Sequence, residues 1–365
     1  MIGPRIYTAL ALVLVASACE RRAPEWEASN PILPLPEPPL GIEARLTELE
    51  DPPTPERVRL GRWLFYDSRL SADGTVSCGT CHRPDHAFSE PSAVSTGIGG
   101  QQGGRKAPSF VNQAWTIYPN FFWDGRSSSL EDQALGPIQN PIEMGNTVEA
   151  MLTSLEEAGA YAPYFAEAFG DPEITADRVA KAIADYERTR MSGNSPWDRW
   201  KDGDQRAMSE LAKHGEELFF GKANCNKCHL SQNFTDSRFH NLGVGWTSGR
   251  GGFSDEGRYL VTKKDADRGA FKTPTLREAS EHAPYMHDGS IPTLRKVIEL
   301  YNLGGTANPY LDPRIKPLGL TEGEIDALVA FLEALEGEGY HDTPPHSFPS
   351  VDRTSMSETD VARAN

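Results

Sequence analysis

Residues Cys78-Gly79-Thr80-Cys81-His82 have the pattern Cys-x-x-Cys-His, and the pattern returns at Cys225-Asn226-Lys227-Cys228-His229. This is the attachment signature of a c-type haem, in which two thiols bond to one edge of the porphyrin and the next residue binds the iron. A four-cysteine zinc site would leave both histidines without a role. A chance match is also disfavoured, because the two signatures use every cysteine except Cys19. We therefore predict two covalent haems, with His82 and His229 as iron ligands.

The composition limits the fold and the partners. A chain of 365 residues is long enough for two domains of ordinary size. Its 28 prolines and 33 glycines predict long loops between helices. No long alternating strand pattern appears, so we expect a mainly α fold. The net charge of −16 argues against a nucleic-acid partner, because phosphates would be repelled. It favours a basic partner protein or simple solubility.

Residues 1–19 are predicted to be an export signal. An apolar run, too short to span a bilayer, follows a weakly positive start, and small residues then lead to Cys19. A cysteine at this position resembles a bacterial lipoprotein cleavage site, so lipidation of Cys19 and ordinary cleavage nearby are both open. Either route takes the chain to the periplasm, and we expect membrane contact only through such a lipid anchor.

The rest of the chain divides into four predicted segments. Residues 20–55 are rich in proline and glutamate, which is typical of a tether. An N-terminal haem domain is expected over residues 56–191 and a C-terminal one over residues 205–340. The polar stretch Ser192 to Asp204 is predicted to be the boundary between them. Residues 341–365 are polar without periodicity, which predicts a flexible tail.

Helical spacing appears in both expected domains. A short helix is predicted over residues 56–66, two helices over residues 147–190, and one over residues 321–335 that begins with a Thr-x-x-Glu capping box. The stretch Gly215-Glu216-Glu217-Leu218-Phe219 is similar to Gly61-Arg62-Trp63-Leu64-Phe65. Each stretch precedes a haem signature, so the chain looks like two cytochrome-like halves.

Further motifs lie between and after the two signatures. They are Trp123-Asp124-Gly125-Arg126, Leu130-Glu131-Asp132-Gln133-Ala134, Gly136-Pro137, Asn140-Pro141-Ile142-Glu143-Met144, Asp255-Glu256-Gly257-Arg258-Tyr259, Phe271-Lys272-Thr273-Pro274-Thr275-Leu276-Arg277 and Pro284-Tyr285-Met286-His287-Asp288-Gly289. Over residues 56–336 their types and spacing resemble the di-haem cytochrome c peroxidases and their MauG-type relatives. The resemblance implies two cytochrome c-like domains with the haems at their interface. It also implies an enzyme that reduces hydrogen peroxide with electrons from a donor protein, which would be a small cytochrome, a copper protein or a protein substrate.

The resemblance also implies roles for the two haems. Haem 1, held by His82, would bind peroxide, and haem 2, held by His229, would relay electrons. Trp123 matches the tryptophan between the haems, where an easily oxidised ring could carry electrons. Arg126 is expected to contribute to cofactor binding.

Three residues match the family's peroxide pocket. Glu143 matches the catalytic glutamate, with Gln133 beside it and Pro137 lining the same pocket. A carboxylate held over the iron can move a proton from one peroxide oxygen to the other, which assists cleavage of the bond between them. The glutamine amide can hold peroxide or a water by hydrogen bonding.

Two positions depart from the plain bacterial peroxidases. Ile98 stands where those enzymes carry a distal histidine on haem 1, and its side chain cannot bind iron, so haem 1 is expected to be open in the ferric state. Tyr301 stands where many of them carry the methionine ligand of haem 2, as in the MauG-type branch. A phenolate ligand favours the oxidised iron states. The alternative is that Tyr301 packs and Met286 is the ligand.

A third departure concerns calcium. Lys106 occupies the position where the family commonly has an asparagine that helps to hold a calcium ion. An ammonium cannot ligate calcium but could replace its charge, so we expect that site to be weakened or absent.

We expect a MauG-like enzyme that needs no reductive activation. The alternatives are a reductively activated cytochrome c peroxidase that detoxifies peroxide, and a di-haem electron-transfer cytochrome without catalysis.

Overall fold

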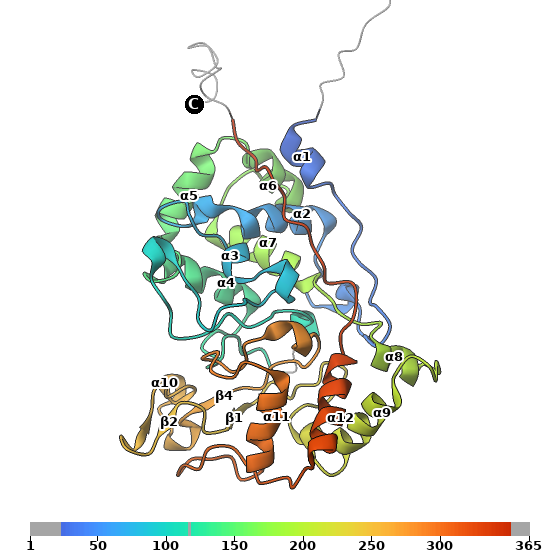
Figure 1. Cartoon of the computed structure of the whole chain (residues 1–365). Coiled ribbons are helices and arrows are strands. Elements are labelled where there is room, and N and C mark those ends of the chain that lie inside the picture. Colours follow the sequence, from blue (N-terminus) through green and yellow to red (C-terminus); the bar gives the residue numbers. More distant parts are fainter. Residues whose placement is uncertain (1–22, 116–117, 352–365) are drawn as a thin grey trace, which may run out of the picture.

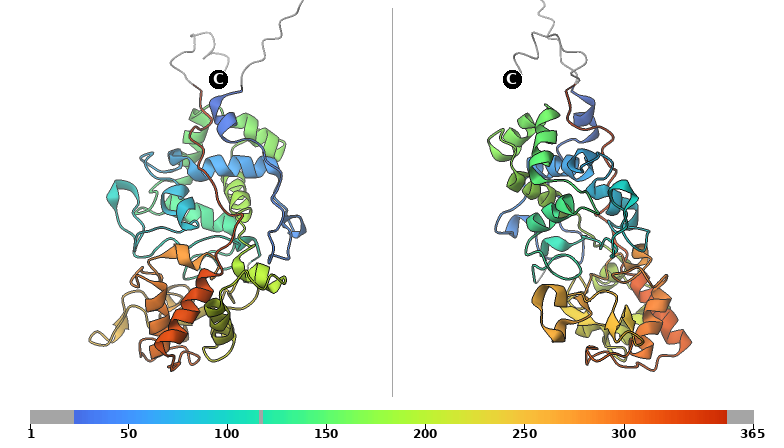
Figure 2. Two further views of the ribbon diagram at one scale, coloured as in Figure 1. Left: turned by 45° about the vertical axis from the view of Figure 1, so that its right-hand side comes forward. Right: turned by 90° about the vertical axis from the view of Figure 1, so that its left-hand side faces the viewer.

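Two helical halves, each containing one haem signature, lie end to end in the computed structural model of the protein (Figures 1 and 2). The structure describes residues 23–115 and 118–351, so the predicted export signal and Cys19 lie outside the described residues. The secondary structure is mainly helical, as predicted. Within the described ranges, no helix has both the length and the apolar character needed to span a bilayer.

The described part of the N-terminal half consists mainly of α-helices. They are α2 (Pro55–Tyr66), α3 (Cys78–Cys81), α4 (Leu130–Gln139), α5 (Val148–Glu157), α6 (Ala162–Phe169) and α7 (Ala176–Arg188), preceded by the short α1 (Glu25–Ser29). The prediction for the first of these, over residues 56–66, is confirmed. The hydrophobic core of this half lies between α2, α5, α6 and α7 and is rich in aromatic rings.

The C-terminal half combines helices with two small antiparallel sheets. Its helices are α8 (Pro196–Lys201), α9 (Glu210–Phe220), α10 (Tyr259–Thr262), α11 (Leu294–Leu303) and α12 (Glu322–Glu333). The strands are β1 (Phe239–Asn241), paired with β4 (Ala270–Lys272), and β2 (Trp246–Thr247), paired with β3 (Gly252–Phe253). The predicted capping box is confirmed: Thr321 caps α12, and the Glu324 side chain accepts from the Thr321 backbone N–H.

The prediction of two helices over residues 147–190 is wrong, because the structure has three there. Gly159 follows the end of α5 with φ of 74°, and Gly170 caps the end of α6 with φ of 77°. Both values lie in the left-handed region, which glycine adopts readily and which ends a helix. The two glycines therefore divide the segment into α5, α6 and α7.

Residues 341–351, which belong to the predicted flexible tail, run back along the N-terminal half to its far end (Figure 1). The Asp342 carboxylate accepts hydrogen bonds from Arg62 Nε at 2.9 Å and from the Tyr186 hydroxyl at 2.6 Å. Further on, the Val351 N–H donates to the Ala158 carbonyl at 2.9 Å. A guanidinium and a buried phenol thus supply the donors that bind this polar segment.

The predicted tether also lies on the protein instead of extending away from it. Leu46 is buried, the Leu40 carbonyl accepts from the Asn194 N–H at 2.7 Å, and the Glu43 N–H donates to Gln232 Oε1 at 2.8 Å. The segment therefore passes from the N-terminal half, where α1 lies, to the boundary region around α8 (Figure 1).

The similarity between the two stretches that precede the haem signatures has a packing explanation. Gly61 in α2 faces α7, where an added Cβ would lie 1.8 Å from the Ala182 carbonyl oxygen. Gly215 in α9 faces α12, where a Cβ would lie 1.9 Å from the Ala327 carbonyl oxygen. In each half, the glycine lets two helix backbones touch beside the haem signature.

Replacing Gly215 by alanine is expected to destabilise the protein by about 1–3 kcal/mol, because the methyl group must displace the α12 backbone. Gly323→Ala is a matched control, since Gly323 lies in α12 with open space around its Cα. That change is expected to raise stability by about 0.4–1 kcal/mol. Urea unfolding of the holoprotein checks both values, and equal stability of the two variants would contradict the packing explanation.

Candidate active site

Each haem signature presents a histidine whose ring is oriented by a backbone carbonyl. His82 Nδ1 donates to the Phe88 carbonyl at 2.9 Å, and His229 Nδ1 donates to the Phe234 carbonyl at 2.9 Å. This hydrogen bond leaves Nε2 with the lone pair that a metal requires. Burial lowers the pKa of both histidines, to about 4 for His229, which favours the neutral ring.

Two cavities adjoin these histidines. Cavity 1 has a volume of about 540 Å³ and is lined by Cys78, Cys81 and His82. Cavity 2 has a volume of about 410 Å³ and is lined by Cys225, Cys228 and His229. Both volumes fall in the range of cofactor pockets. In each cavity two free thiols and one neutral imidazole share the wall, so the residues present fit a covalently attached haem.

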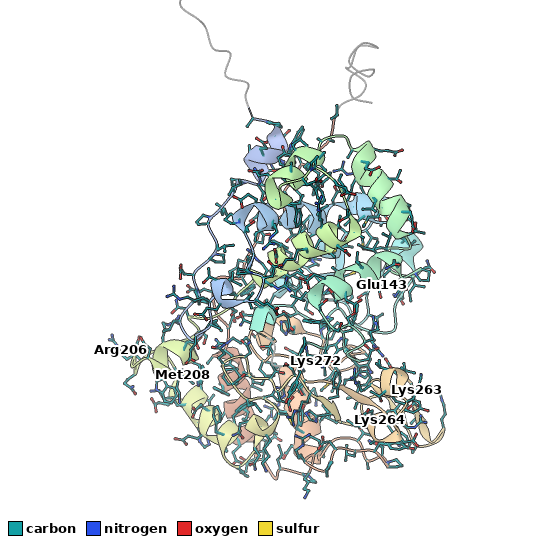
Figure 3. The ribbon with its side chains drawn as sticks, turned by 180° about the vertical axis from the view of Figure 1, so that it is seen from behind. Glu143, Arg206, Met208, Lys263, Lys264 and Lys272 are labelled. Carbon is teal, nitrogen blue, oxygen red and sulfur yellow. The ribbon has the colours of Figure 1, made fainter. Side chains whose placement is uncertain are left out.

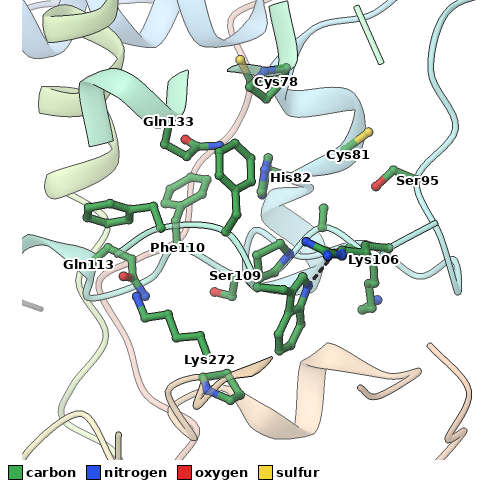
Figure 4. A pocket seen from close by; sticks show the side chains of 18 of the residues that line it. Cys78, Cys81, His82, Ser95, Lys106, Ser109, Phe110, Gln113, Gln133 and Lys272 are labelled. Atoms are coloured by element: carbon green, nitrogen blue, oxygen red, sulfur yellow. Dashed lines mark hydrogen bonds between the residues drawn. The ribbon is translucent and has the colours of Figure 1, made fainter. Parts of the chain in front are cut away.

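The residues predicted for the peroxide pocket come together in the wall of cavity 1. Gln133 and Pro137 belong to α4, and Glu143 belongs to the turn that follows this helix. Trp123 and Arg126 line the same cavity from the preceding loop. Figure 4 shows Gln133 in the upper part of the cavity. The five residues therefore share one chamber although they come from a loop, a helix and a turn.

Glu143 has the surroundings of a proton-exchanging group. Its Oε1 accepts a hydrogen bond from Asn140 Nδ2 at 2.8 Å, which leaves Oε2 for another partner. Burial raises the pKa of Glu143 above its ordinary value, while the charge of Arg126 and the Asn140 hydrogen bond oppose this rise. A carboxyl group whose pKa is raised toward neutrality can both accept and return a proton.

Trp123 is fixed in the wall between the two cavities, and it lines both of them. Its indole Nε1 donates to the Lys106 carbonyl at 2.8 Å, and its own carbonyl accepts from the Lys272 N–H at 2.8 Å. The first contact holds the ring and the second holds the backbone. The tryptophan is thus positioned by one segment from each half of the protein.

The sequence model described as "Di-haem cytochrome c peroxidase" matches residues 55–206. The "Methylamine utilization protein MauG" of Methylorubrum extorquens is 44% identical over 289 residues, which cover 79% of this chain and 80% of that protein. The chain belongs to the di-haem cytochrome c peroxidase and MauG family. The predicted family is therefore confirmed, and the chain is a haem peroxidase, an oxidoreductase.

Other members of this family show the same relationship. The "Cytochrome c551 peroxidase" of Nitrosomonas europaea is 33% identical over 287 residues, 79% of this chain and 82% of that protein. A solved structure of a "MauG-like protein associated with microbial copper homeostasis" matches with a TM-score of 0.75 and 32% identity. This match covers 87% of this chain and 98% of that one. MauG-type and plain peroxidases are thus both among the relatives.

The two positions that are predicted to separate MauG-type from plain peroxidases lie in different halves of the molecule. The Ile98 side chain packs against the hydrophobic core of the N-terminal half, and its N–H donates to the Glu143 carbonyl at 2.9 Å. Tyr301, from α11, lines cavity 2 together with Met286. Burial raises the pKa of Tyr301, so its phenol stays neutral unless a nearby cation stabilises the phenolate.

Lys106 is buried at the position expected for a family calcium ligand. Its ammonium donates to the backbone carbonyls of Glu90 and Ser92, at 3.4 Å for the latter. Burial lowers the pKa of Lys106 to about 8, and the negative charge of Glu90 opposes this shift. A protonated side chain therefore occupies the carbonyl-lined space beside Trp123.

Sequence reasoning missed several polar groups in the cavity walls. The Nε2 atoms of His282 and His287 line cavity 2 and have no hydrogen-bond partner among the described residues. Glu187 of α7 lines cavity 1, where burial raises its pKa to about 8. Lys272 lines both cavities. Lys272 and His287 lie within the quoted motifs, which could have drawn attention to them, whereas Glu187 follows an apolar helix pattern without any signal.

Proposed function

We propose that the protein is an exported di-haem peroxidase that reduces hydrogen peroxide at haem 1 and draws electrons through Trp123 and haem 2 from a donor protein. The observation that carries the proposal is that Trp123 lines both cavities, whereas Glu143 and Gln133 line cavity 1 alone. The predicted acid–base residue Glu143 and its neighbour Gln133 therefore belong to one chamber only, and an oxidisable ring lies between the two chambers.

The residues of cavity 1 provide the proton chemistry of this reaction. When bound, the haems supply the electron-transfer chemistry that cleaves the oxygen–oxygen bond. Because Asn140 binds Oε1 of Glu143, Oε2 takes a proton from one peroxide oxygen and returns it to the other. The Gln133 amide donates a hydrogen bond that orients the peroxide, and Pro137 closes the same wall. Peroxide, two protons and two electrons then yield two molecules of water.

The enzyme is proposed to react in the diferric state, without prior reduction. The hydrocarbon side chain of Ile98 packs into the core and offers no ligand to haem 1. Tyr301 is proposed as the second ligand of haem 2, where a phenolate stabilises oxidised iron. A reductively activated peroxidase would require a removable ligand on haem 1, and an electron carrier would leave Glu143 and Gln133 without a function.

Tyr301→Phe is expected to raise the midpoint potential of haem 2, because the variant loses the anionic ligand that favours ferric iron. The expected rise exceeds about 59 mV, which is a tenfold change for a one-electron couple. Met286→Leu is the matched control, since Met286 also lines cavity 2, and its potential should stay close to that of the wild type. Spectroelectrochemical titration measures both potentials. A lowered potential in Met286→Leu beside an unchanged one in Tyr301→Phe would make Met286 the ligand, because a thioether raises the potential.

The remaining parts of the proposal concern calcium, location and partner. The Lys106 ammonium is proposed to replace the family's calcium ion, because it donates to the carbonyls of Glu90 and Ser92. Metal analysis that found one calcium per chain would contradict this substitution.

The predicted export signal indicates a periplasmic enzyme, with a lipid anchor if Cys19 is modified. The electron donor would be a small cytochrome, a copper protein or a protein substrate.

A further inference from the structure

Lys272 is a partly buried cation at the junction of the two halves (Figure 3). It is the last residue of β4, and its N–H donates to the Trp123 carbonyl at 2.8 Å. Its Nζ lies 5.1 Å from the centre of the Phe121 ring, and in Figure 4 the side chain points toward Gln113. Phe121 and Gln113 line cavity 1 and not cavity 2. The ammonium of Lys272 therefore projects into cavity 1.

Two arginines that line cavity 1 form ion pairs with carboxylates, whereas Lys272 forms none with the described residues. Arg105 pairs with Asp124 and Asp255, at 2.7 Å in each case, and Arg126 pairs with Asp124 at 3.0 Å. Lys272 forms no ion pair with any residue in the part of the chain that the structure describes. Burial alone lowers its pKa, to about 8. A cation withdrawn from water is costly unless an anion accompanies it, and the cost rises with the extent of its burial.

The position of Lys272 in cavity 1 indicates which anion this is. Figure 4 shows Cys78 and Cys81 at the top of the cavity, Lys272 at the bottom and His82 between them. The two thiols bond to the vinyl edge of a c-type haem. The carboxylates of a haem are its two propionates, which lie on the edge opposite to the vinyl groups.

We propose that the Lys272 ammonium is the counter-charge for a propionate of haem 1, which it holds beside Trp123. This inference rests on the proposed function, because it requires haem 1 in cavity 1. A cation at the haem edge stabilises the ferrous form relative to the ferric form by electrostatics. Since the Lys272 backbone also holds Trp123, one residue sets the potential of haem 1 and positions its edge next to the tryptophan. Lys272 is thus a positioning residue.

The test compares Lys272→Met with wild type by spectroelectrochemical titration of each haem in the holoprotein. At a fixed applied potential, the ratio of ferric to ferrous haem 1 is expected to rise about tenfold, which corresponds to about 59 mV for a one-electron couple. Haem 2 should change far less and serves as an internal control. Lys272→Arg keeps the charge and should restore the potential of haem 1. Lys264→Met removes an exposed lysine elsewhere in the same half and should change neither haem.

An unchanged haem 1 potential in Lys272→Met, or a shift of haem 2 instead, would overturn the inference. If this variant fails to assemble, Lys272→Gln keeps most of the side-chain length and is judged by the same criterion. The reaction of the wild type with peroxide is followed in parallel. Its absence overturns the proposed function, whereas a normal reaction with an unchanged potential in the variant overturns only the role of Lys272.

Discussion

Replacing Glu143 by glutamine is expected to slow the reaction of the protein with hydrogen peroxide by about 100- to 10,000-fold, the usual contribution of a general acid–base group. Glutamine keeps the size of the side chain and an oxygen for the Asn140 hydrogen bond, but it cannot take and return a proton. Stopped-flow mixing with one equivalent of peroxide measures the rate. Glu149→Gln, an exposed change on α5, is the matched control and should react like the wild type.

The pH dependence of this reaction should follow from the raised pKa of Glu143. The carboxylate form, which accepts the peroxide proton, is present above the pKa, so the rate should fall as the pH is lowered through it. Because burial raises the pKa, this fall should begin at a higher pH than for an ordinary glutamate. The Glu143→Gln variant should lose this limb of the profile. A variant that reacts as fast as the wild type would remove Glu143 from the mechanism.

Arg277→Met is expected to lower the free energy of unfolding by about 3–5 kcal/mol, because it leaves the charge of Asp198 buried without its partner. Both side chains are fully buried, and the guanidinium binds the carboxylate through two contacts of 2.6 and 2.9 Å. Arg277 Nε also donates to the Gln232 carbonyl at 2.8 Å. This ion pair fastens α8, in the predicted boundary Ser192 to Asp204, to the rest of the C-terminal half.

Urea unfolding of the oxidised holoprotein measures this loss. Lys213→Met is the control, because Lys213 pairs with an exposed Glu210 at 2.7 Å and such surface pairs contribute at most about 1 kcal/mol. The double variant Arg277→Met with Asp198→Asn removes both charges and should lose less than the sum of the single changes. Equal stability of the Arg277→Met and Lys213→Met variants would contradict the importance of this buried pair.

Much of the cofactor site could be predicted from sequence because haem attachment imposes a local pattern. The spacing Cys78, Cys81 and His82 is fixed by the porphyrin, and the structure places the three residues in one cavity wall. Helix α12 was equally predictable, since its cap and apolar face are local features. Turn signals such as Gly159 and Gly170 were visible in the sequence, but their left-handed conformation was needed to show that three helices replace two.

The features that escaped prediction depend on contacts between distant segments. The wall of cavity 1 brings Phe121 of the N-terminal half beside Lys272 of β4, and no local pattern encodes that approach. The burial of Asp342 against Arg62 has the same origin, because its partner lies 280 residues away in the chain. The polar composition of this segment predicts a tail, and the donors for the Asp342 carboxylate cannot be seen from the local sequence.

The decisive measurement is the optical and EPR spectrum of the purified diferric protein, before and after one equivalent of hydrogen peroxide. With Ile98 offering no ligand to haem 1 and Tyr301 bound to haem 2, the resting protein should show one high-spin and one low-spin haem. Both should change promptly on addition of peroxide. Two low-spin haems that respond only after one-electron reduction would contradict this and indicate a reductively activated peroxidase, and no response even then would indicate an electron carrier.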